Sequence, residues 1–211
     1  MSLSDEKILK AKHIIHEAEK KEKEKQESKE NLENELKESI MDGKVHIYGQ
    51  EVEFSRRKNE EYGVSIMMPT TSFDLDEQLK MEIYPSGNRP KYVYGNATVN
   101  LVISLNLTNN RIPVDKLEPF LDYGEKLLKV TMPKVTNIER KMIDKEDYQI
   151  GVMEFISTAI DTEVYNTTFY VIVKGQILMG NINFPLKYKE RQLTIAKEML
   201  ESFEIEDVEE Q

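Results

Sequence analysis

The stretch YQIGVMEFISTAIDTEVYNTTFYVIVKGQILMGNINF, residues 148–184, decides the fold. Apolar and polar side chains alternate along it, which is typical of strands that bury one face. Its joints, Asp161-Thr162 and Lys174-Gly175, are short and rich in turn-forming residues. Short joints hold consecutive strands antiparallel, so the pattern predicts a four-stranded meander. One more alternating run, at about 137–143, precedes this stretch. We therefore expect strands at about 137–143, 148–160, 163–173 and 176–184.

The same period-two alternation occurs earlier in the chain. Gly49-Gln50 separates two short apolar runs and predicts a hairpin. Pro69 ends another run, since proline cannot donate to a strand ladder. Strands are therefore predicted at 45–48, 51–55, 64–68 and 99–107.

Two amphipathic helices interrupt these strands. The first is predicted at about 115–131, where Asp115 and Glu118 are spaced as a capping box. The second is predicted at about 186–202, with Pro185 at its start. Strands, a helix, four strands and a helix indicate an α+β fold, an antiparallel sheet flanked by helices.

Residues 1–42 differ from the rest in composition. They hold 12 acidic residues and 9 Lys, and the run from Glu19 to Asn31 has no apolar side chain. Lys and Glu at such spacing favour a solvated helix, which we expect over about 5–41. At 1.5 Å per residue it would be about 55 Å long. A domain of the remaining length is about 40 Å across, so the helix would extend beyond it.

Composition excludes several classes of protein. The 211 residues contain no Cys, which rules out disulfides, thiolate metal sites and a Cys nucleophile. The net charge of -10 argues against a nucleic-acid partner, because such binding rests on cations that meet phosphates. No stretch reaches the roughly 18 apolar residues of a membrane span. We expect a cytoplasmic protein, unless a leader has been removed from its start, with a charged helical extension (1–42), one domain (43–205) and an acidic tail (206–211).

The sequence contains no recognisable catalytic or metal-binding motif. His13 and His16 share an i,i+3 spacing, but no third ligand stands near them. Ser55–Lys58 fits the S-x-x-K pattern of acyl-enzymes, yet its partner motifs are absent. We therefore expect no enzyme activity, no catalytic residue, no metal and no cofactor.

One loop has the composition of a protein-binding surface. Tyr and Arg are favoured at interface hot spots, and the Pro- and Gly-containing stretch 84–94 holds three Tyr and two cations, Arg89 and Lys91. The alternative is that its rings cover a sheet edge and the loop is a turn. The candidate surface residues are Tyr84, Arg89, Tyr92 and Tyr94.

Several segments together resemble the PsbP-like superfamily. They are Tyr62–Pro69, Arg89–Tyr94, Val99–Leu105, the meander 148–184 with Pro185, and 189–203. The resemblance covers roughly residues 44–205 and implies an α/β/α sandwich. Members of this superfamily generally act as accessory or binding proteins, and no shared catalytic residue accompanies the fold.

These observations lead to one expectation and two alternatives. We expect a bacterial, non-enzymatic accessory domain that binds a protein partner of unknown identity. The first alternative is a structural protein that self-associates through the helix at 5–41. The second is a small-ligand binder or enzyme that uses a cleft between sheet and helix, which would show as a pocket with converging polar side chains.

Overall fold

The computed structural model describes residues 28, 31, 32, 34, 35, 37–84, 87, 89–159 and 162–206. Its elements, in chain order, are η1 (Ile40–Asp42), β1 (Lys44–Ile47), β2 (Gln50–Asn59), β3 (Val64–Pro69), β4 (Phe73–Asp74), α2 (Glu77–Ile83), β5 (Tyr92–Asn96), β6 (Leu101–Arg111), η2 (Val114–Lys116), α3 (Leu117–Thr131), β7 (Thr136–Asp144), β8 (Gln149–Thr158), β9 (Glu163–Val173), β10 (Gln176–Pro185), η3 (Leu186–Tyr188), α4 (Lys189–Glu201) and β11 (Glu204–Ile205).

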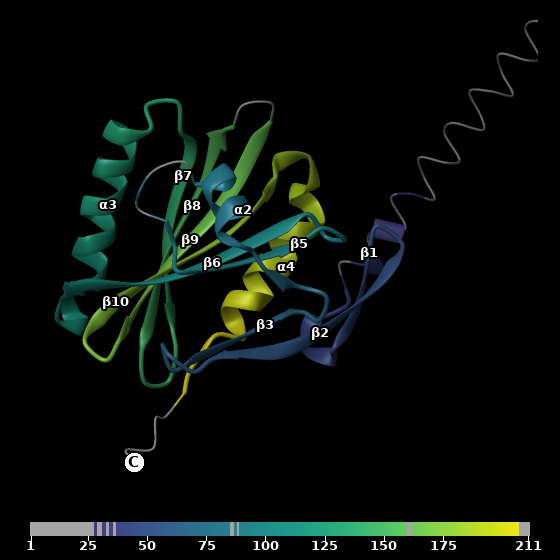
Figure 1. Cartoon of the computed structure of the whole chain (residues 1–211), viewed down its shortest axis with the longest axis horizontal. Helices are drawn as coiled ribbons and strands as arrows, with labels where there is room; N and C mark the ends of the chain where they lie inside the picture. Colours follow the sequence, from purple (N-terminus) through teal and green to yellow (C-terminus); the bar gives the residue numbers. More distant parts are fainter. Residues whose placement is uncertain are drawn as a thin grey trace, which may run out of the picture.

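The strands form two antiparallel sheets (Figure 1). The smaller sheet has the order β1-β2-β3-β11, and the larger has the order β4-β5-β6-β10-β9-β8-β7. The predicted meander is confirmed, because β7, β8, β9 and β10 each pair with the next strand along the chain. The α+β class is confirmed as well.

The two longer helices cover opposite faces of the seven-stranded sheet. In β9, Phe169 packs on Phe203 just after α4, with ring centroids 5.5 Å apart. The next residue, Tyr170, packs on Phe120 of α3, with centroids 5.4 Å apart. Neighbouring strand residues point to opposite faces, so α3 and α4 are separated by the sheet (Figure 1).

The main core lies on the α4 face. Helix α4 contacts β10 of the large sheet and β3 of the small sheet, so both of its sides are covered. The ring of Phe169 lies against the backbone of Gly180, where an added Cβ would stand 2.0 Å from the ring. The fully buried apolar residues contributed by α4 and its end are Ile195, Ala196, Met199, Leu200 and Phe203.

The α3 face is packed more thinly. Only Leu117 and Leu121 of α3 are buried. Leu121 sits over Gly151 of β8, where a Cβ would meet its side chain at 2.8 Å. The glycine thus lets the first half of α3 approach the sheet, while the second half leaves apolar side chains uncovered.

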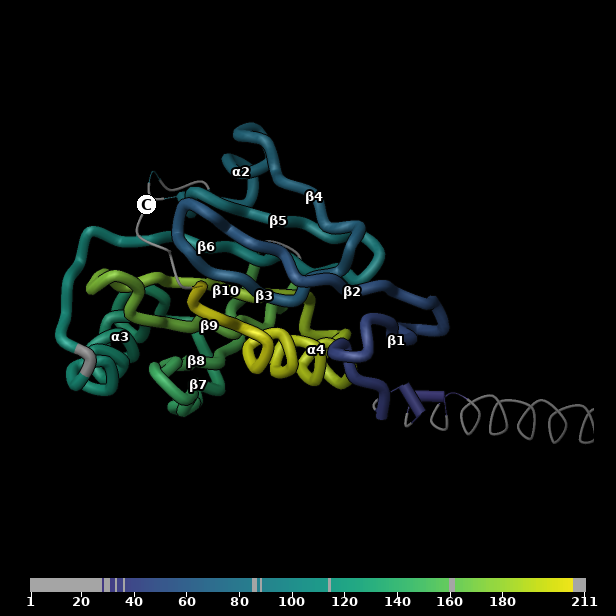
Figure 2. Tube along the Cα trace, turned by 90° about the horizontal axis from the view of Figure 1, so that it is seen from below, coloured from purple at the N-terminus to yellow at the C-terminus, as the bar shows by residue number. Residues whose placement is uncertain are grey.

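The N-terminal helix is shorter than predicted at its C-terminal end. Most of residues 5–41 lie outside the described part of the chain; Glu35 is the last described helical residue before η1, and Lys37 is already in a turn. Lys37 then closes a tighter turn, with its N–H donating to the carbonyl of Asn34 at 3.0 Å. The chain enters β1 beside α4 (Figure 2) after Gly43, whose φ of 83° ends η1.

Two local predictions are wrong. The Asp115–Glu118 capping box does not form, because Lys116 is the N-cap of α3 and makes no side-chain cap bond. Stretch 84–94 is not one loop, since Tyr92 begins β5. The sequence patterns also missed α2, whose N-cap Asp76 accepts a hydrogen bond from the Leu79 N–H at 2.9 Å.

The close contact at Gly180 predicts a matched pair of outcomes. Gly180→Ala places a methyl group inside the ring of Phe169, and we expect a loss of about 1–3 kcal/mol in the free energy of unfolding. Gly124→Ala is the control, because its Cβ meets only the flexible end of Met153, at 3.3 Å. Urea denaturation measures both. Equal stability of the two variants would contradict this packing.

Candidate functional site

A partly open groove of about 490 Å³ lies between α3 and the large sheet. One side of α3 forms a wall, strands β6, β8, β9 and β10 form the floor, and Tyr84 and Pro90 complete the lining. The α3 side chains in the wall are Phe120, Tyr123, Leu127, Leu128 and Thr131. Concave sites of this size with mostly apolar walls are typical of ligand pockets.

Strand register places a polar row across the floor of the groove. Asn181 of β10 lies opposite Ser104 of β6 on one side and opposite Thr168 of β9 on the other. Two residues further along, Met179 and Tyr170 pair with each other in the same orientation. Thr108 and Asn110 of β6 line the groove beyond that pair, so polar side chains stand at both ends of the floor.

Two polar atoms beside this row, the Tyr84 hydroxyl and Asn181 Oδ1, are buried and have no partner of good hydrogen-bond geometry among the described residues. Burial raises the pKa of Tyr84, while side-chain hydrogen bonding with Ser104 and Asn183 acts in the opposite direction. Protein atoms shield both atoms from solvent, so they belong to the packed floor of the groove and are not surface that a ligand reaches.

The outer surface of α3 adds exposed apolar area beside the groove. Tyr123 is 63% exposed and Leu127 is 48% exposed, and both also line the groove. Val130, on the same helix, is 79% exposed and lies outside the groove lining. Clustered exposed apolar residues of this kind commonly mark interaction sites.

The four residues predicted as a protein-binding surface do not share one exposed face. Tyr84 lines the groove, and the Arg89 Nε donates to the Tyr84 carbonyl at 3.0 Å. Tyr92 donates its hydroxyl to Glu61, and that bond raises its pKa to about 12. Tyr94 is 4% exposed, with Arg57 stacked 4.4 Å from its ring centroid, so burial removes it from any such surface.

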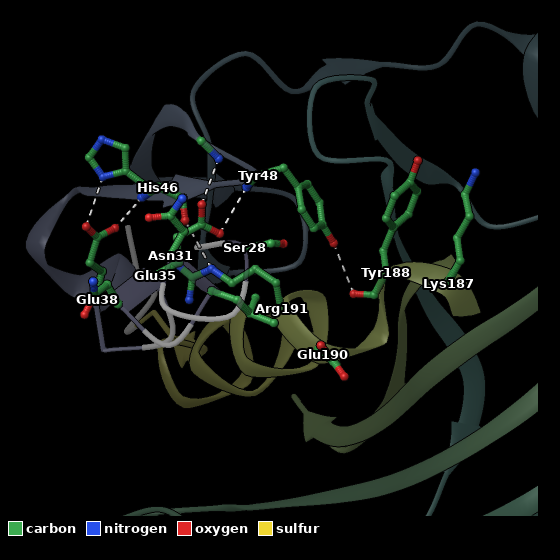
Figure 3. A pocket seen from close by; sticks show the side chains of 13 residues that line it. Ser28, Asn31, Glu35, Glu38, His46, Tyr48, Lys187, Tyr188, Glu190 and Arg191 are labelled. Atoms are coloured by element: carbon green, nitrogen blue, oxygen red, sulfur yellow. Dashed lines mark hydrogen bonds and ion pairs between the residues drawn. The ribbon is translucent and has the colours of Figure 1, made fainter. Parts of the chain in front are cut away.

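A second, polar pocket of about 850 Å³ lies where the N-terminal segment meets α4 (Figure 3). At its base is Arg191 of α4, which is only 1% exposed. Its Nε and Nη2 donate to the carbonyl of His46, at 3.2 and 3.0 Å. Burial lowers the pKa of Arg191, and the negative charges of Glu35 and Glu198 oppose that shift.

Carboxylates around Arg191 cap backbone N–H groups of the β1–β2 hairpin. Glu35 accepts from the N–H groups of Tyr48 at 3.1 Å and Gly49 at 2.7 Å. Glu38 accepts from the His46 N–H and contacts the His46 Nδ1 at 2.9 Å (Figure 3). These contacts fasten the N-terminal segment to the domain, so we interpret the second pocket as a structural junction.

The described residues offer no cluster of three or more metal-ligating side chains. His13 and His16 lie outside them. Within the same ranges, no helix is long and apolar enough to cross a membrane.

A seven-stranded antiparallel sheet with a helix on each face, and a smaller sheet beyond one of them, is a PsbP-like architecture. The solution structure of cyanobacterial PsbP (CyanoP) from Synechocystis sp. PCC 6803 is similar to this chain, with a TM-score of 0.55. The likeness covers 72% of this chain and 92% of that chain at 14% identity, and it shows the fold that the sequence predicted.

The crystal structure of PA94 from Pseudomonas aeruginosa, a protein of unknown function, is a weaker match. It has 11% identity and a TM-score of 0.36, over 71% of this chain and 94% of that chain. No protein-family model and no curated protein matches the sequence.

Sequence reasoning missed the groove as a set of residues. Tyr84 was the only candidate in its lining, whereas Ser104, Thr168 and Asn181 come from three strands far apart in the chain. In the sequence, each of these strands carries a polar residue at a position that faces the groove. Only the register shows that these positions form one row.

The junction around Arg191 predicts a stability effect. Arg191→Met removes the donors to the His46 carbonyl and leaves Glu35 without its neighbouring positive charge. We expect a loss of about 1–3 kcal/mol in the free energy of unfolding, measured by urea denaturation. Lys187→Met is the control, because Lys187 borders the same pocket but is exposed. Similar losses in both variants would disprove a special role for Arg191.

The Glu38–His46 contact predicts a pH dependence. The His46 backbone N–H lowers the pKa of Glu38 below its ordinary value of 4.5. The stability that this carboxylate adds is therefore present above pH 4.5 and lost as the pH falls through the lowered pKa. Glu38→Gln should be less stable than wild type at neutral pH, and the difference should shrink in acid. A difference that stays constant down to about pH 3 in urea titrations would contradict this.

Proposed function

We propose that this protein is a non-enzymatic accessory domain that works by binding, and that the groove beside α3 is its binding site. The observation that carries the proposal is the groove itself, a preformed concave site with mostly apolar walls and uncharged polar side chains on its floor. The PsbP-like resemblance supports an accessory role, because the superfamily is known mainly for such proteins.

The chemistry of the groove favours binding over catalysis. Its lining contains hydroxyl and amide groups but, within the described ranges, no acidic, basic or histidine side chain. Burial raises the pKa of Tyr170 to about 12, so its hydroxyl stays neutral near pH 7. General acid–base catalysis needs a group that titrates near the working pH, and the lining supplies none.

The exposed apolar residues of α3 favour a protein partner as a second candidate. Val130 and Met132 lie outside the groove lining, so a ligand held within the groove would leave them uncovered. A protein that packs along α3 would cover them and insert a side chain into the groove. The two candidates therefore differ in whether Val130 contributes to binding: a protein partner would contact it, and a ligand held in the groove would not.

Two substitutions on α3 test the proposed site. Leu127→Glu puts a carboxylate into the groove wall, whereas Val130→Glu makes the same charge change outside it. With Nile red, a neutral dye that fluoresces in apolar surroundings, we expect wild type to bind and Leu127→Glu to bind about tenfold more weakly. Val130→Glu should bind like wild type.

Both positions are exposed enough for the variants to fold, which circular dichroism would verify. Equal dye binding by Leu127→Glu and wild type would refute the groove as the site. A natural partner whose binding is weakened by Val130→Glu as much as by Leu127→Glu would instead identify the protein-partner candidate.

A further inference from the structure

We infer that the N-terminal segment closes the outer edge of β1 and thereby prevents a second copy of this chain from pairing with that strand. The edge belongs to the small sheet, which α4 and the large sheet separate from the groove, so the inference is independent of the proposed binding site. Three observations support it: the direction of the backbone groups of β1, the side chains that bind them, and the anchoring of the segment.

The register of the β1–β2 pair shows which backbone groups of β1 point outward. In an antiparallel pair, the N–H and carbonyl groups of every second residue point toward the partner strand. The N–H of Phe54 in β2 donates to the carbonyl of Gly43 at 2.8 Å. The residues whose backbone groups point toward β2 are therefore Gly43, Val45 and Ile47. His46, between the last two, points both its N–H and its carbonyl away from β2.

Side chains bind both outward groups of His46. Its N–H donates to Glu38 Oε2 (Figure 3). Its carbonyl accepts from Nε and Nη2 of Arg191, at 3.2 and 3.0 Å. A neighbouring strand would supply the same two partners, an acceptor for the N–H and a donor for the carbonyl. Glu38 and Arg191 thus occupy the place of an additional strand.

The same capping continues into the turn between β1 and β2. Glu35 accepts from the N–H of Tyr48 at 3.1 Å and from the N–H of Gly49 at 2.7 Å. Together with the His46 N–H, three backbone donors along one edge are bound by two carboxylates of the N-terminal segment. Unpaired groups on an outer strand are a template on which another chain can pair. The two carboxylates remove that template.

The segment that carries the carboxylates is anchored separately from them. Ile40 is 0% exposed, and its N–H donates to Glu198 of α4 at 2.8 Å. Removing the carboxylates of Glu35 and Glu38 therefore leaves the anchor in place. The closure of the edge can be tested in the full chain for this reason.

A second copy of β1 fits the edge that the carboxylates cover. With the two strands antiparallel and one His46 opposite the other, the N–H of each His46 meets the carbonyl of the other. Lys44 would lie opposite the uncharged side chain of Tyr48, so these positions do not oppose like charges. Arg191 still leaves an acceptor at the His46 carbonyl, because a carbonyl oxygen has two lone pairs.

The double variant Glu35→Ala/Glu38→Ala opens the edge. Sedimentation velocity of the full chain should show it self-associating at least about tenfold more strongly than wild type, because three backbone N–H groups lose charged acceptors. Glu51→Ala/Glu53→Ala is the matched control. It removes the same charge from β2, where both carboxylates pair with Lys44, and should sediment like wild type. Circular dichroism verifies that both variants fold.

Two further changes in the double variant locate the contact at β1. The chain contains no Cys, so His46→Cys can form a disulfide only between copies. Opposed residues of a hydrogen-bonded antiparallel pair have Cα atoms about 5.5 Å apart, within disulfide reach. Glu51→Cys, one strand further from the contact in each copy, should not cross-link. His46→Pro removes the outward N–H and should restore wild-type sedimentation.

Three results would overturn the inference: a folded double variant that sediments like wild type, association that persists with His46→Pro, or disulfides that form equally at Glu51→Cys. If the double variant does not fold, Glu38→Ala replaces it, since Glu35 then still caps the turn. His46→Cys should then cross-link more in the Glu38→Ala background than in wild type. Equal cross-linking in the two backgrounds would also overturn the inference.

Discussion

The burial of α4 between the two sheets is the interaction on which the rest of the structure depends. Its apolar side chains fill the space between β10 and β3, and the Phe169 ring closes that core against Gly180. The same helix carries Arg191 and Glu198, which hold the N-terminal segment through the His46 carbonyl and the Ile40 N–H. One helix thus joins the large sheet, the small sheet and the start of the domain.

Because the main core lies on the α4 face, the opposite face of the large sheet carries less of the packing. Helix α3 buries only Leu117 and Leu121, and it approaches the sheet closely where Gly151 allows it. The rest of that face can therefore keep polar residues such as Ser104 and Asn181 without disrupting the core. The α4 face of the sheet therefore supplies the main core, and the α3 face supplies the groove.

The sequence predicted most of the strands and helices α3 and α4, because alternation and helical spacing are local properties, but it missed the short strands β4, β5 and β11. The meander was predictable from the short joints at Asp161-Thr162 and Lys174-Gly175 alone. The division into two sheets was not, because β3 pairs with β11, which lies more than a hundred residues further along the chain. Helix α2 was missed because it buries none of its residues and so has no apolar stripe to detect.

The candidate site was less predictable than the fold because its lining depends on long-range strand pairing. Aromatic content drew attention to Tyr84, which lines the groove, but it gave equal weight to Tyr94, whose ring the fold buries under Arg57. Tyr84 and Tyr94 differ in the strands that their side chains contact. Which strands lie beside each tyrosine is set by long-range strand pairing. The polar row of Ser104, Asn181 and Thr168 exists only once three strands are aligned. A binding site made from one residue of each strand leaves no motif in the sequence, so its chemistry becomes visible only through register.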